Sequence, residues 1–433
     1  MNQTRKLSVP MQDHPLRYAL ANELHARPFP TLEAPCTAAY LAIKQPKDAA
    51  ARDRKADVEH LIALLDRYGA PHPQPGATHY FGKIGRHMLK WEQHTEFVTY
   101  TAFSEGLSGR AFDPHDFEVF PEDWLAAAPG TRVTSALIRV DHRPKEGEVA
   151  AQLADWFVPE SLACSAVLDD TASVAGDFRI DPAGHLRFAV FVAPDTGERR
   201  IGRIVQRLCE IETYKSMSML GLARVRQMGK RLNEMDNELT DLVGNMTSNG
   251  APAEETLKAL LGISAELENL MAQTSFRFGA TGAYEAIVNQ RIGVLREERF
   301  KGRQTFAEFM MRRFDPAMRT VKATERRLAA MSDRAIRAGD LLRTRVDVER
   351  SAQNQKLLES MDKRADLQLR LQKTVEGLSV VAISYYAVNL VINMAEPFGD
   401  AAGLSKLVLT AIATPVVILL VWWMVQRVRK SME

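Results

Sequence analysis

The chain has 433 residues, of which 46% are hydrophobic and 25% are charged, so it can bury a large core. This composition excludes an intrinsically disordered chain and a small disulfide-stabilised protein. Lysine and arginine total 56 against 54 aspartate and glutamate, and the resulting net charge of +2 excludes a uniformly basic surface. The three cysteines, Cys36, Cys164 and Cys209, are widely separated and fit neither a disulfide framework nor a CxxC metal site.

Residues 1–13 are polar and contain proline, so we expect a flexible N-terminus without a cleavable signal peptide. In the next segment, residues 14–30 (HPLRYALANELHARPFP), leucines and many polar side chains surround a short helix that ends at Pro28. Two interpretations stay open. The helix either docks on a sheet as a capped structural element, or it presents His25 and Arg27 to a ligand.

Residues 14–197 contain runs in which apolar and polar side chains alternate, which is the period of a half-buried strand. Strands are expected at residues 91–103, 135–143, 162–168 and 185–193. Helices are expected at residues 48–68 and 145–157. The sequence therefore predicts a cytoplasmic N-terminal domain of the α/β type, and an α+β fold for the chain as a whole.

The first of these predicted strands carries a candidate for chemistry. Glu92, His94 and Glu96 alternate, so a strand would project all three from one face toward a divalent cation. Such a site needs a fourth ligand from elsewhere, for which His25 and His142 are candidates. The alternative is a polar sheet face with a hydrogen-bonded histidine.

Other motifs with a known chemistry are missing from the sequence. No GxSxG, Walker or GxGxxG motif stands between a strand and a helix, so nothing favours nucleophilic hydrolysis or nucleotide binding. No strand interleaves basic and aromatic residues, and we expect no nucleic-acid partner. The cofactor, apart from a possible divalent cation, stays unknown.

From residue 198 the apolar spacing becomes helical and remains so. Residues 198–314 are expected to form several helices. Glycine-rich sequences predict two breaks between them, at residues 247–254 (TSNGAPAE) and 278–282 (FGATG).

A long helix is expected next, because no proline lies between Pro316 and Pro397. Its residues 315–376 form a helical stalk. A heptad row of apolar side chains gives the stalk one buried seam, formed by Val321, Leu328, Ala335 and Leu342. The seam predicts either a coiled coil or a helix packed irregularly against its neighbours.

Two apolar segments near the C-terminus contain no charged residue. Residues 377–395 (GLSVVAISYYAVNLVINMA) and 407–426 (LVLTAIATPVVILLVWWMVQ) are each long enough to span a bilayer as a helix. Only residues 396–406 separate them. The sequence therefore predicts a transmembrane hairpin over residues 377–426, with the lipid bilayer as a partner.

The charges around this hairpin predict its orientation. Basic side chains flank the two spans: Lys363, Arg364, Arg370 and Lys373 before the first, and Arg427, Arg429 and Lys430 after the second. The connecting loop has Lys406 alone. By the positive-inside rule, the N-terminal domain and a basic tail at residues 427–433 are expected to be cytoplasmic.

The first predicted span contains one polar stripe. Ser379, Tyr386 and Asn393 repeat every seven residues, and Asn389 lies one turn before Asn393. Polar groups inside a bilayer need partners or water. The stripe therefore predicts either hydrogen bonds between helices of a self-associated protein, or the lining of a water-filled pore.

Several distinctive sequences extend over nearly the whole chain: HPLRYALANELHARPFP, WEQHTEF, QRLCEIETYKSM, LLRTRVDVE and LQLRLQKTVEGLSVVAISYY. With these motifs the chain resembles an uncharacterised bacterial family, a domain of unknown function expected to be membrane-anchored. The resemblance implies a family and an anchor in the inner membrane of a bacterium, but no activity.

The order of the parts is also similar to that of CorA-type magnesium channels, in which a cytoplasmic domain and a long helix precede two spans. Those channels carry Gly-Met-Asn at the outer end of the first span, where this chain has Ile392, Asn393 and Met394. The departure puts selective magnesium transport in doubt.

Three functions follow from these observations. The first is an oligomeric, membrane-anchored cytoplasmic scaffold or sensor without catalysis of its own. The second is a CorA-like cation channel. The third is a membrane-tethered, metal-dependent enzyme that uses Glu92, His94 and Glu96.

Overall fold

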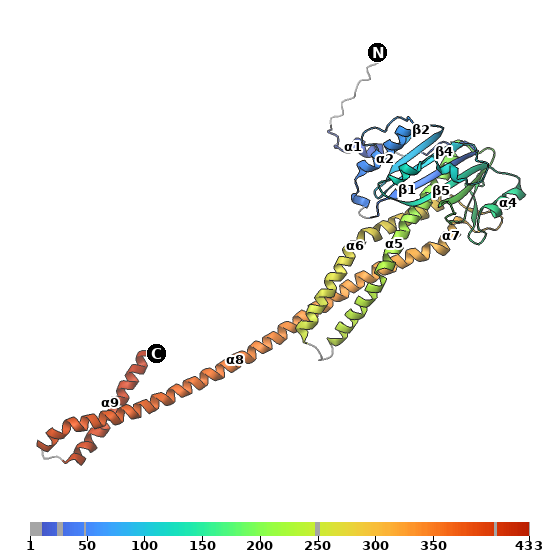
Figure 1. Ribbon diagram of the computed structural model, residues 1–433. Helices are drawn as coiled ribbons and strands as arrows, with labels where there is room; N and C mark the ends of the chain where they lie inside the picture. The colour runs from blue at the N-terminus through green and yellow to red at the C-terminus, as the bar shows by residue number, and fades with distance from the viewer. Residues whose placement is uncertain (1–10, 24–28, 47–48, 247–251, 402–404, 433) are drawn as a thin grey trace. The chain divides into compact units, whose positions relative to one another are not determined.

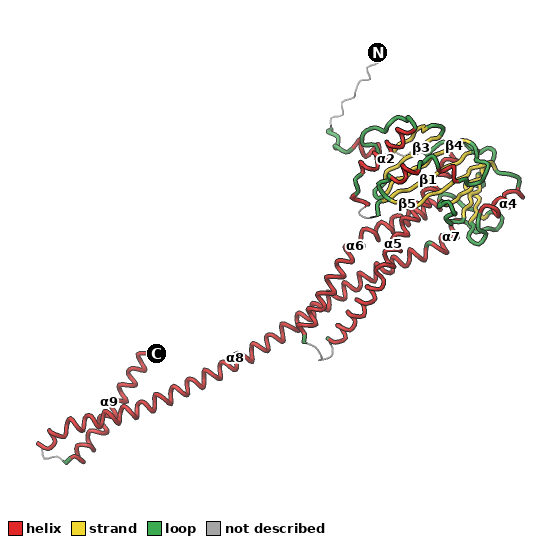
Figure 2. Tube along the Cα trace, viewed as in Figure 1, coloured by secondary structure: helices red, strands yellow, loops and turns green. Residues whose placement is uncertain are grey.

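The computed structural model describes residues 11–23, 29–46, 49–246, 252–401 and 405–432. The chain divides into two units (Figure 1). Unit 1 comprises residues 1–247 and 259–337, and unit 2 comprises residues 248–258 and 338–433. In Figure 2 the strands all lie in unit 1, while the described residues of unit 2 are almost entirely helical. The predicted α+β fold is confirmed.

Unit 1 is built on one mixed sheet of nine strands, in the order β2-β3-β4-β1-β5-β8-β7-β6-β9. The strands are β1 Cys36–Lys44, β2 His79–Ile84, β3 His87–Gln93, β4 Phe97–Glu105, β5 Thr131–His142, β6 Ala163–Val167, β7 Ala172–Gly176, β8 Leu186–Val192 and β9 Glu298–Arg299. Among the described pairs only β5 and β8 run parallel, and the other neighbours are antiparallel.

Helices cover both faces of this sheet. Those of unit 1 are α1 Arg17–Glu23, η1 Ala49–Ala51, α2 Arg54–Arg67, η2 Pro114–Phe117, α3 Glu122–Ala126, α4 Glu146–Trp156, α5 Glu198–Asn245, α6 Ala253–Gly293 and α7 Phe306–Arg313. One core contains side chains of α2, α3 and α4, and the other contains side chains of α5, α6 and α7. The helices predicted at residues 48–68 and 145–157 are confirmed as η1 with α2 and as α4.

Strand β1 lies near the middle of the sheet and is buried on both faces. Ala38, Tyr40 and Ala42 belong to the core under α5, whereas Leu41 and Ile43 belong to the core under α2. All nine residues of β1 are buried. A strand covered on both sides has no alternation of polar and apolar residues, so the sequence pattern does not predict β1.

Helix α6 is continuous through residues 278–282, so the predicted break at FGATG is wrong. Thr281 is buried and packs against α5 at Gly221, where an added Cβ would lie 2.3 Å from the Thr281 Oγ1. Glycine lowers helix propensity by about 1 kcal/mol, but packing along a helix outweighs that cost. The close approach of α5 and α6 therefore decides the conformation that local sequence left open.

The predicted seam is buried where the long helix begins in unit 1. Val321, Leu328 and Ala335 are each at most 2% exposed. Arg327 and Arg334 of the same helix both pair with Asp236 of α5. The seam therefore packs against neighbouring helices of the same chain, as one of the two interpretations predicted.

The long helix is α8, Asp315–Ala401, and its 87 residues confirm the predicted single helix. It is followed by α9, Lys406–Met432. Within the described part of the chain, two helices contain segments long and apolar enough to cross a membrane, by length and composition. The two predicted spans, residues 377–395 and 407–426, lie within these helices.

Candidate functional site

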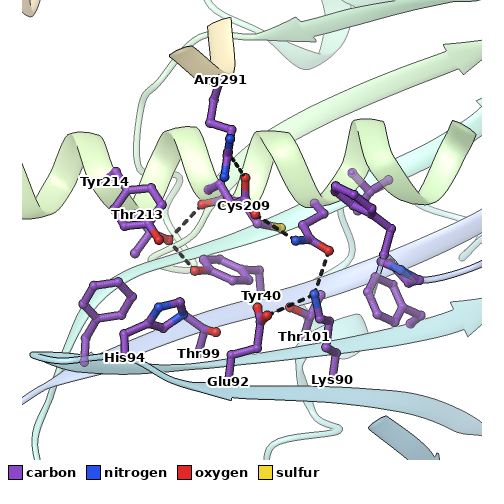
Figure 3. A pocket seen from close by; sticks show the side chains of 17 residues that line it. Tyr40, Lys90, Glu92, His94, Thr99, Thr101, Cys209, Thr213, Tyr214 and Arg291 are labelled. Atoms are coloured by element: carbon purple, nitrogen blue, oxygen red, sulfur yellow. Dashed lines mark hydrogen bonds and ion pairs between the residues drawn. The ribbon is translucent and has the colours of Figure 1, made fainter. Parts of the chain in front are cut away.

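A cavity of about 210 Å³ lies in unit 1, between the sheet and helix α5 (Figure 3). Strands β1, β3 and β4 form one wall, and α5 forms the other. Arg291 near the end of α6 lines the cavity too. Many of the described residues that line the cavity are polar or charged.

Strands β3 and β4 supply four polar side chains to the cavity. In their antiparallel register Lys90 lies opposite Thr101, and Glu92 lies opposite Thr99. Alternate residues of a strand project to the same face, so all four side chains point toward α5. The sheet thereby places an ammonium, a carboxylate and two hydroxyls side by side.

Helix α5 supplies the opposite wall. Gln206, Cys209, Glu210, Thr213 and Tyr214 all line the cavity. Their spacing of three and four residues places them along one face of the helix. These residues belong to the motif QRLCEIETYK, whose polar side chains at helical spacing are the signal of this site in the sequence.

The charged groups of the cavity form one chain of contacts. The Lys90 Nζ lies 3.2 Å from the Glu92 Oε1 and donates a 2.6 Å hydrogen bond to the Gln206 Oε1. The Gln206 Nε2 donates to the Glu210 Oε1 at 2.8 Å, and Arg291 donates to the other oxygen of Glu210. The two cations, Lys90 and Arg291, balance the two carboxylates, Glu92 and Glu210, so this network of contacts has no net charge.

Tyr40 of β1 is hydrogen-bonded to Thr213 of α5. The Thr213 hydroxyl donates to the Cys209 carbonyl oxygen at 2.8 Å, so the Tyr40 hydroxyl must be the donor of the pair. Burial, the largest cause, raises the pKa of Tyr40 well above its ordinary value. Tyr40 thus keeps its proton and acts as a fixed donor.

The hydroxyls of Thr99 and Thr101 differ from that pair. Both residues are buried, at 5% and 7% exposed, and they line the cavity. No group among the described residues hydrogen-bonds to either hydroxyl. Both hydroxyls face the open space of the cavity, where a bound molecule can hydrogen-bond to them.

Cys209 also faces the cavity, but its chemistry is suppressed. Burial, the largest cause, raises the pKa of its thiol far above the ordinary value. The thiolate is the nucleophilic form of cysteine, so this side chain is a poor nucleophile. Burial likewise raises the pKa of the Cys36 and Cys164 thiols to about 12.

The structure separates the predicted trio of Glu92, His94 and Glu96. The prediction of one strand over residues 91–103 is wrong, because β3 ends at Gln93 and β4 begins at Phe97. The His94 N–H donates to the Phe97 carbonyl oxygen at 2.8 Å and closes the turn between them. Alternation within one strand therefore does not apply to these residues.

Glu92 and His94 line the cavity, whereas Glu96 points into a different cluster. Glu96 is 1% exposed, accepts a 2.9 Å hydrogen bond from the Tyr284 hydroxyl and pairs with Arg277 of α6. Within the described ranges, no three His, Cys, Asp or Glu side chains are grouped as a metal site requires. Metal binding by these residues stays a prediction.

The turn that carries His94 is held from its other side by Arg52. This guanidinium is nearly fully buried and forms a 2.8 Å ion pair with Asp57. It also donates to the carbonyl oxygens of His94, Thr95 and Phe97. The rim of the cavity is therefore fixed by a buried network.

The remaining predicted residues lie elsewhere. His142 is exposed at the end of β5 and does not line the cavity. His25 and Arg27 lie outside the described residues, although the following Phe29 and Pro30 line the cavity. The predicted pore residues are all exposed or partly exposed on α8 in unit 2: Ser379, Tyr386, Asn389 and Asn393.

Comparison with known proteins gives the chain a family. The family model described as a protein of unknown function (DUF3422) matches residues 12–432. The chain belongs to this family. The predicted relationship to an uncharacterised domain of unknown function is thereby confirmed. No curated protein and no solved structure matches the chain, and nothing supports the looser likeness to CorA-type channels.

Proposed function

We propose that this DUF3422 protein is a membrane-anchored sensor that binds a small polar molecule in the cavity of unit 1 and catalyses no reaction itself. Segments of α8 and α9 anchor it in the bacterial inner membrane, with unit 1 and the C-terminus in the cytoplasm. Copies of the chain associate with one another.

The observation that carries this proposal is the pair of unpartnered hydroxyls on Thr99 and Thr101 at the cavity wall. Each hydroxyl can donate one hydrogen bond and accept others, so a ligand in the cavity meets two neighbouring groups that can bind it. The four charged groups of the cavity balance, so the ligand has no net charge. The volume of about 210 Å³ is below the 300–1,000 Å³ of common ligand pockets, which favours a small hydroxylated molecule.

Binding is favoured over catalysis by the protonation of the buried groups. Burial raises the pKa of both Tyr40 and Cys209, away from the range in which they would act as base or nucleophile. These groups are suited to recognise a ligand by hydrogen bonds and contact rather than to attack it.

A screen of the full-length protein in detergent tests the cavity. Neutral polyols, monosaccharides and zwitterionic amino acids are added singly, and a ligand at one hundred times its Kd should stabilise the protein by about 2.7 kcal/mol. The double variant Thr99→Val and Thr101→Val keeps the shape of both side chains and removes only the two hydroxyls. The same variant should lose the ligand-induced shift.

Thr320→Val is the matched control, since that hydroxyl is exposed and bonds only to the Pro316 carbonyl oxygen of its own helix, at 2.9 Å. It should keep the full ligand shift. A double variant that keeps the full ligand-induced shift, or a wild-type protein that no compound stabilises, contradicts the proposal.

The membrane topology is supported by the charge asymmetry around the spans and has its own test. The three native cysteines are buried, so one added thiol reports its position with little background. Gly399→Cys in the predicted outer loop should react with an impermeant reagent on intact cells. If the added cysteine reacts only after lysis, the loop faces the cytoplasm and the proposed orientation is wrong.

Self-association is supported by exposed side chains of α8 in unit 2. Asn389 and Asn393 are exposed amides within an apolar span. Residues 351–373 are exposed throughout and include several large apolar side chains: Leu357, Leu358, Met361, Leu367, Leu369 and Leu371. A second copy of the same helix provides both an amide partner and an apolar surface.

A further inference from the structure

A second concave surface of unit 1 differs from the cavity in size and charge. It is an open groove of about 1300 Å³ that shares no lining residue with the cavity. The ends of β1 and β5 form one side, and one face each of α5 and α6 forms the other. We call it the basic groove, because five basic side chains line it: Lys44, Arg132, Lys215, Arg224 and Arg277.

No aspartate or glutamate is among the described residues that line the basic groove. Carboxylates behind the wall neutralise two of the five cations. Lys215 lies 2.6 Å from Glu212, and Arg277 pairs with Glu96. The positive charges of Lys44, Arg132 and Arg224 remain without a carboxylate partner among the described residues.

The partners of these three cations are neutral or missing. The Lys44 Nζ donates to the Gln45 carbonyl oxygen at 2.8 Å, and the Arg224 Nη2 donates to the Gln273 Oε1 at 3.0 Å. Arg132 is exposed and makes no hydrogen bond or ion pair with a described residue. A neutral oxygen leaves the charge of its donor uncompensated.

Two further observations show that positive charge is in excess here. Lys44 is only 8% exposed, and burial, followed by the nearby Arg277, lowers its pKa. The Nη1 of Arg277 is buried and has no hydrogen-bond partner among the described residues. A buried, unpaired guanidinium nitrogen is costly, which fits an excess of positive charge behind the wall of the groove.

We propose that the basic groove binds an anion that carries two or more phosphate groups. The planar fork of an arginine matches the oxygens of a phosphate, and two arginines and a lysine without carboxylate partners can bind several such groups. The volume is larger than that of common small-molecule pockets, so it accommodates a chain of phosphates or a compound that carries one. This site is separate from the cavity, so failure of the proposed sensor function would leave it standing.

Isothermal titration calorimetry of the full-length protein in detergent, with sodium tripolyphosphate as the probe, tests this inference. Binding should weaken as salt rises, because screening reduces charge attraction. Arg132→Gln and Arg224→Gln should each weaken binding by about tenfold, the size expected for one charge-assisted hydrogen bond. Both side chains lie at an open surface, so folding should be unaffected, which circular dichroism checks.

Arg319→Gln is the matched control. Arg319 is an exposed arginine of α8 that makes no ion pair with a described residue and lines none of the described pockets. It should bind like the wild type. Equal weakening in Arg319→Gln would show a non-specific charge effect and overturn the proposal.

A water-soluble, short-chain phosphatidylinositol bisphosphate, whose headgroup carries more than one phosphate, separates the two sources of phosphate. Tighter binding of tripolyphosphate, lost in Arg132→Gln, supports a soluble ligand. Tighter binding of the lipid, lost in the same variant, supports the groove with a lipid headgroup as its ligand. No detectable binding of either probe at low salt, or full binding by the Arg132→Gln and Arg224→Gln double variant, overturns the proposal.

Discussion

Large apolar side chains have opposite surroundings in the two units. Trp91 and Trp124 of unit 1 are at most 1% exposed, whereas Leu378 and Tyr386 of unit 2 are about 70% exposed. Both pairs belong to regular elements with good backbone hydrogen bonding. Unit 1 therefore supplies its own apolar interior, whereas unit 2 leaves large apolar side chains uncovered, as expected for the membrane anchor and the self-association that we propose.

Charged side chains show the same contrast. In unit 1, Arg52 with Asp57 and Glu96 with Arg277 are buried ion pairs. In unit 2, the charged residues of the segment 351–373 are exposed along a single helix. Substitutions in unit 1 should consequently act through lost burial and pairing, and those in unit 2 should act through association. Four predictions sharpen this comparison.

The largest effect is expected at Arg52. Arg52→Met leaves the Asp57 carboxylate buried, at 3% side-chain exposure, without its cation. Breaking a buried pair in this way costs about 3–5 kcal/mol, which urea unfolding of the full-length protein should detect. Arg67→Met removes the exposed pair with Asp123 and should change the unfolding midpoint very little. Equal effects of the two variants would contradict the comparison.

Replacing either of two glycines of α5 by alanine should change the stability less, and the two changes should have opposite signs. Gly221→Ala places a Cβ 2.3 Å from the Thr281 Oγ1 and should destabilise unit 1 by about 1–3 kcal/mol. Gly229→Ala meets no atom within 4 Å and should stabilise the helix by about 0.5–1 kcal/mol. Thermal melts of the two variants would decide the matter, and a shared sign would exclude close α5–α6 packing.

Acid should destabilise unit 1 selectively, because all ten histidines precede residue 186. Burial lowers the pKa of His60 and of His185. The unfolded chain then binds more protons than the native one below about pH 6.5, so the free energy of unfolding falls as the pH falls. Urea unfolding at pH 7.5 and pH 5.5 measures this slope.

Burial also lowers the pKa of His87, so substituting all three histidines by glutamine should flatten the slope, even if the variant is less stable at both pH values. The helical signal of unit 2 should not change over the same range, since its sequence contains no histidine. A slope that survives the triple substitution would assign the acid sensitivity to groups other than these buried histidines.

The smallest effect is expected at Asn393 of unit 2. Hydrogen bonds between membrane helices contribute about 0.6 kcal/mol on average, so Asn393→Leu should weaken self-association only slightly in detergent. Analytical ultracentrifugation of wild type and variant measures this change. A water-filled pore would be favoured instead if wild-type protein conducts cations into proteoliposomes and a correctly assembled Asn393→Leu variant does not. An apolar wall in a pore stops ions by dewetting.

Features that depend on a short stretch of chain were predictable from sequence. The absence of proline between Pro316 and Pro397 predicts one long helix, and α8 is that helix. The two charge-free segments predict elements long and apolar enough to span a bilayer, because length and composition alone decide that property. Alternation likewise located the strands at residues 135–143 and 185–193.

Features that depend on contacts between distant segments required the tertiary structure. Burial of β1 on both faces removes its alternation, and packing at Gly221 keeps α6 continuous where glycines suggested a break. Alternation brings Lys90 close to Glu92, but only the fold places Glu210 and Arg291 beside them. The local sequence pattern determines which face of a helix or strand a side chain occupies. The residues that it meets across that face are determined by the packing of the whole domain, and the balance of charge in the cavity therefore depends on that packing.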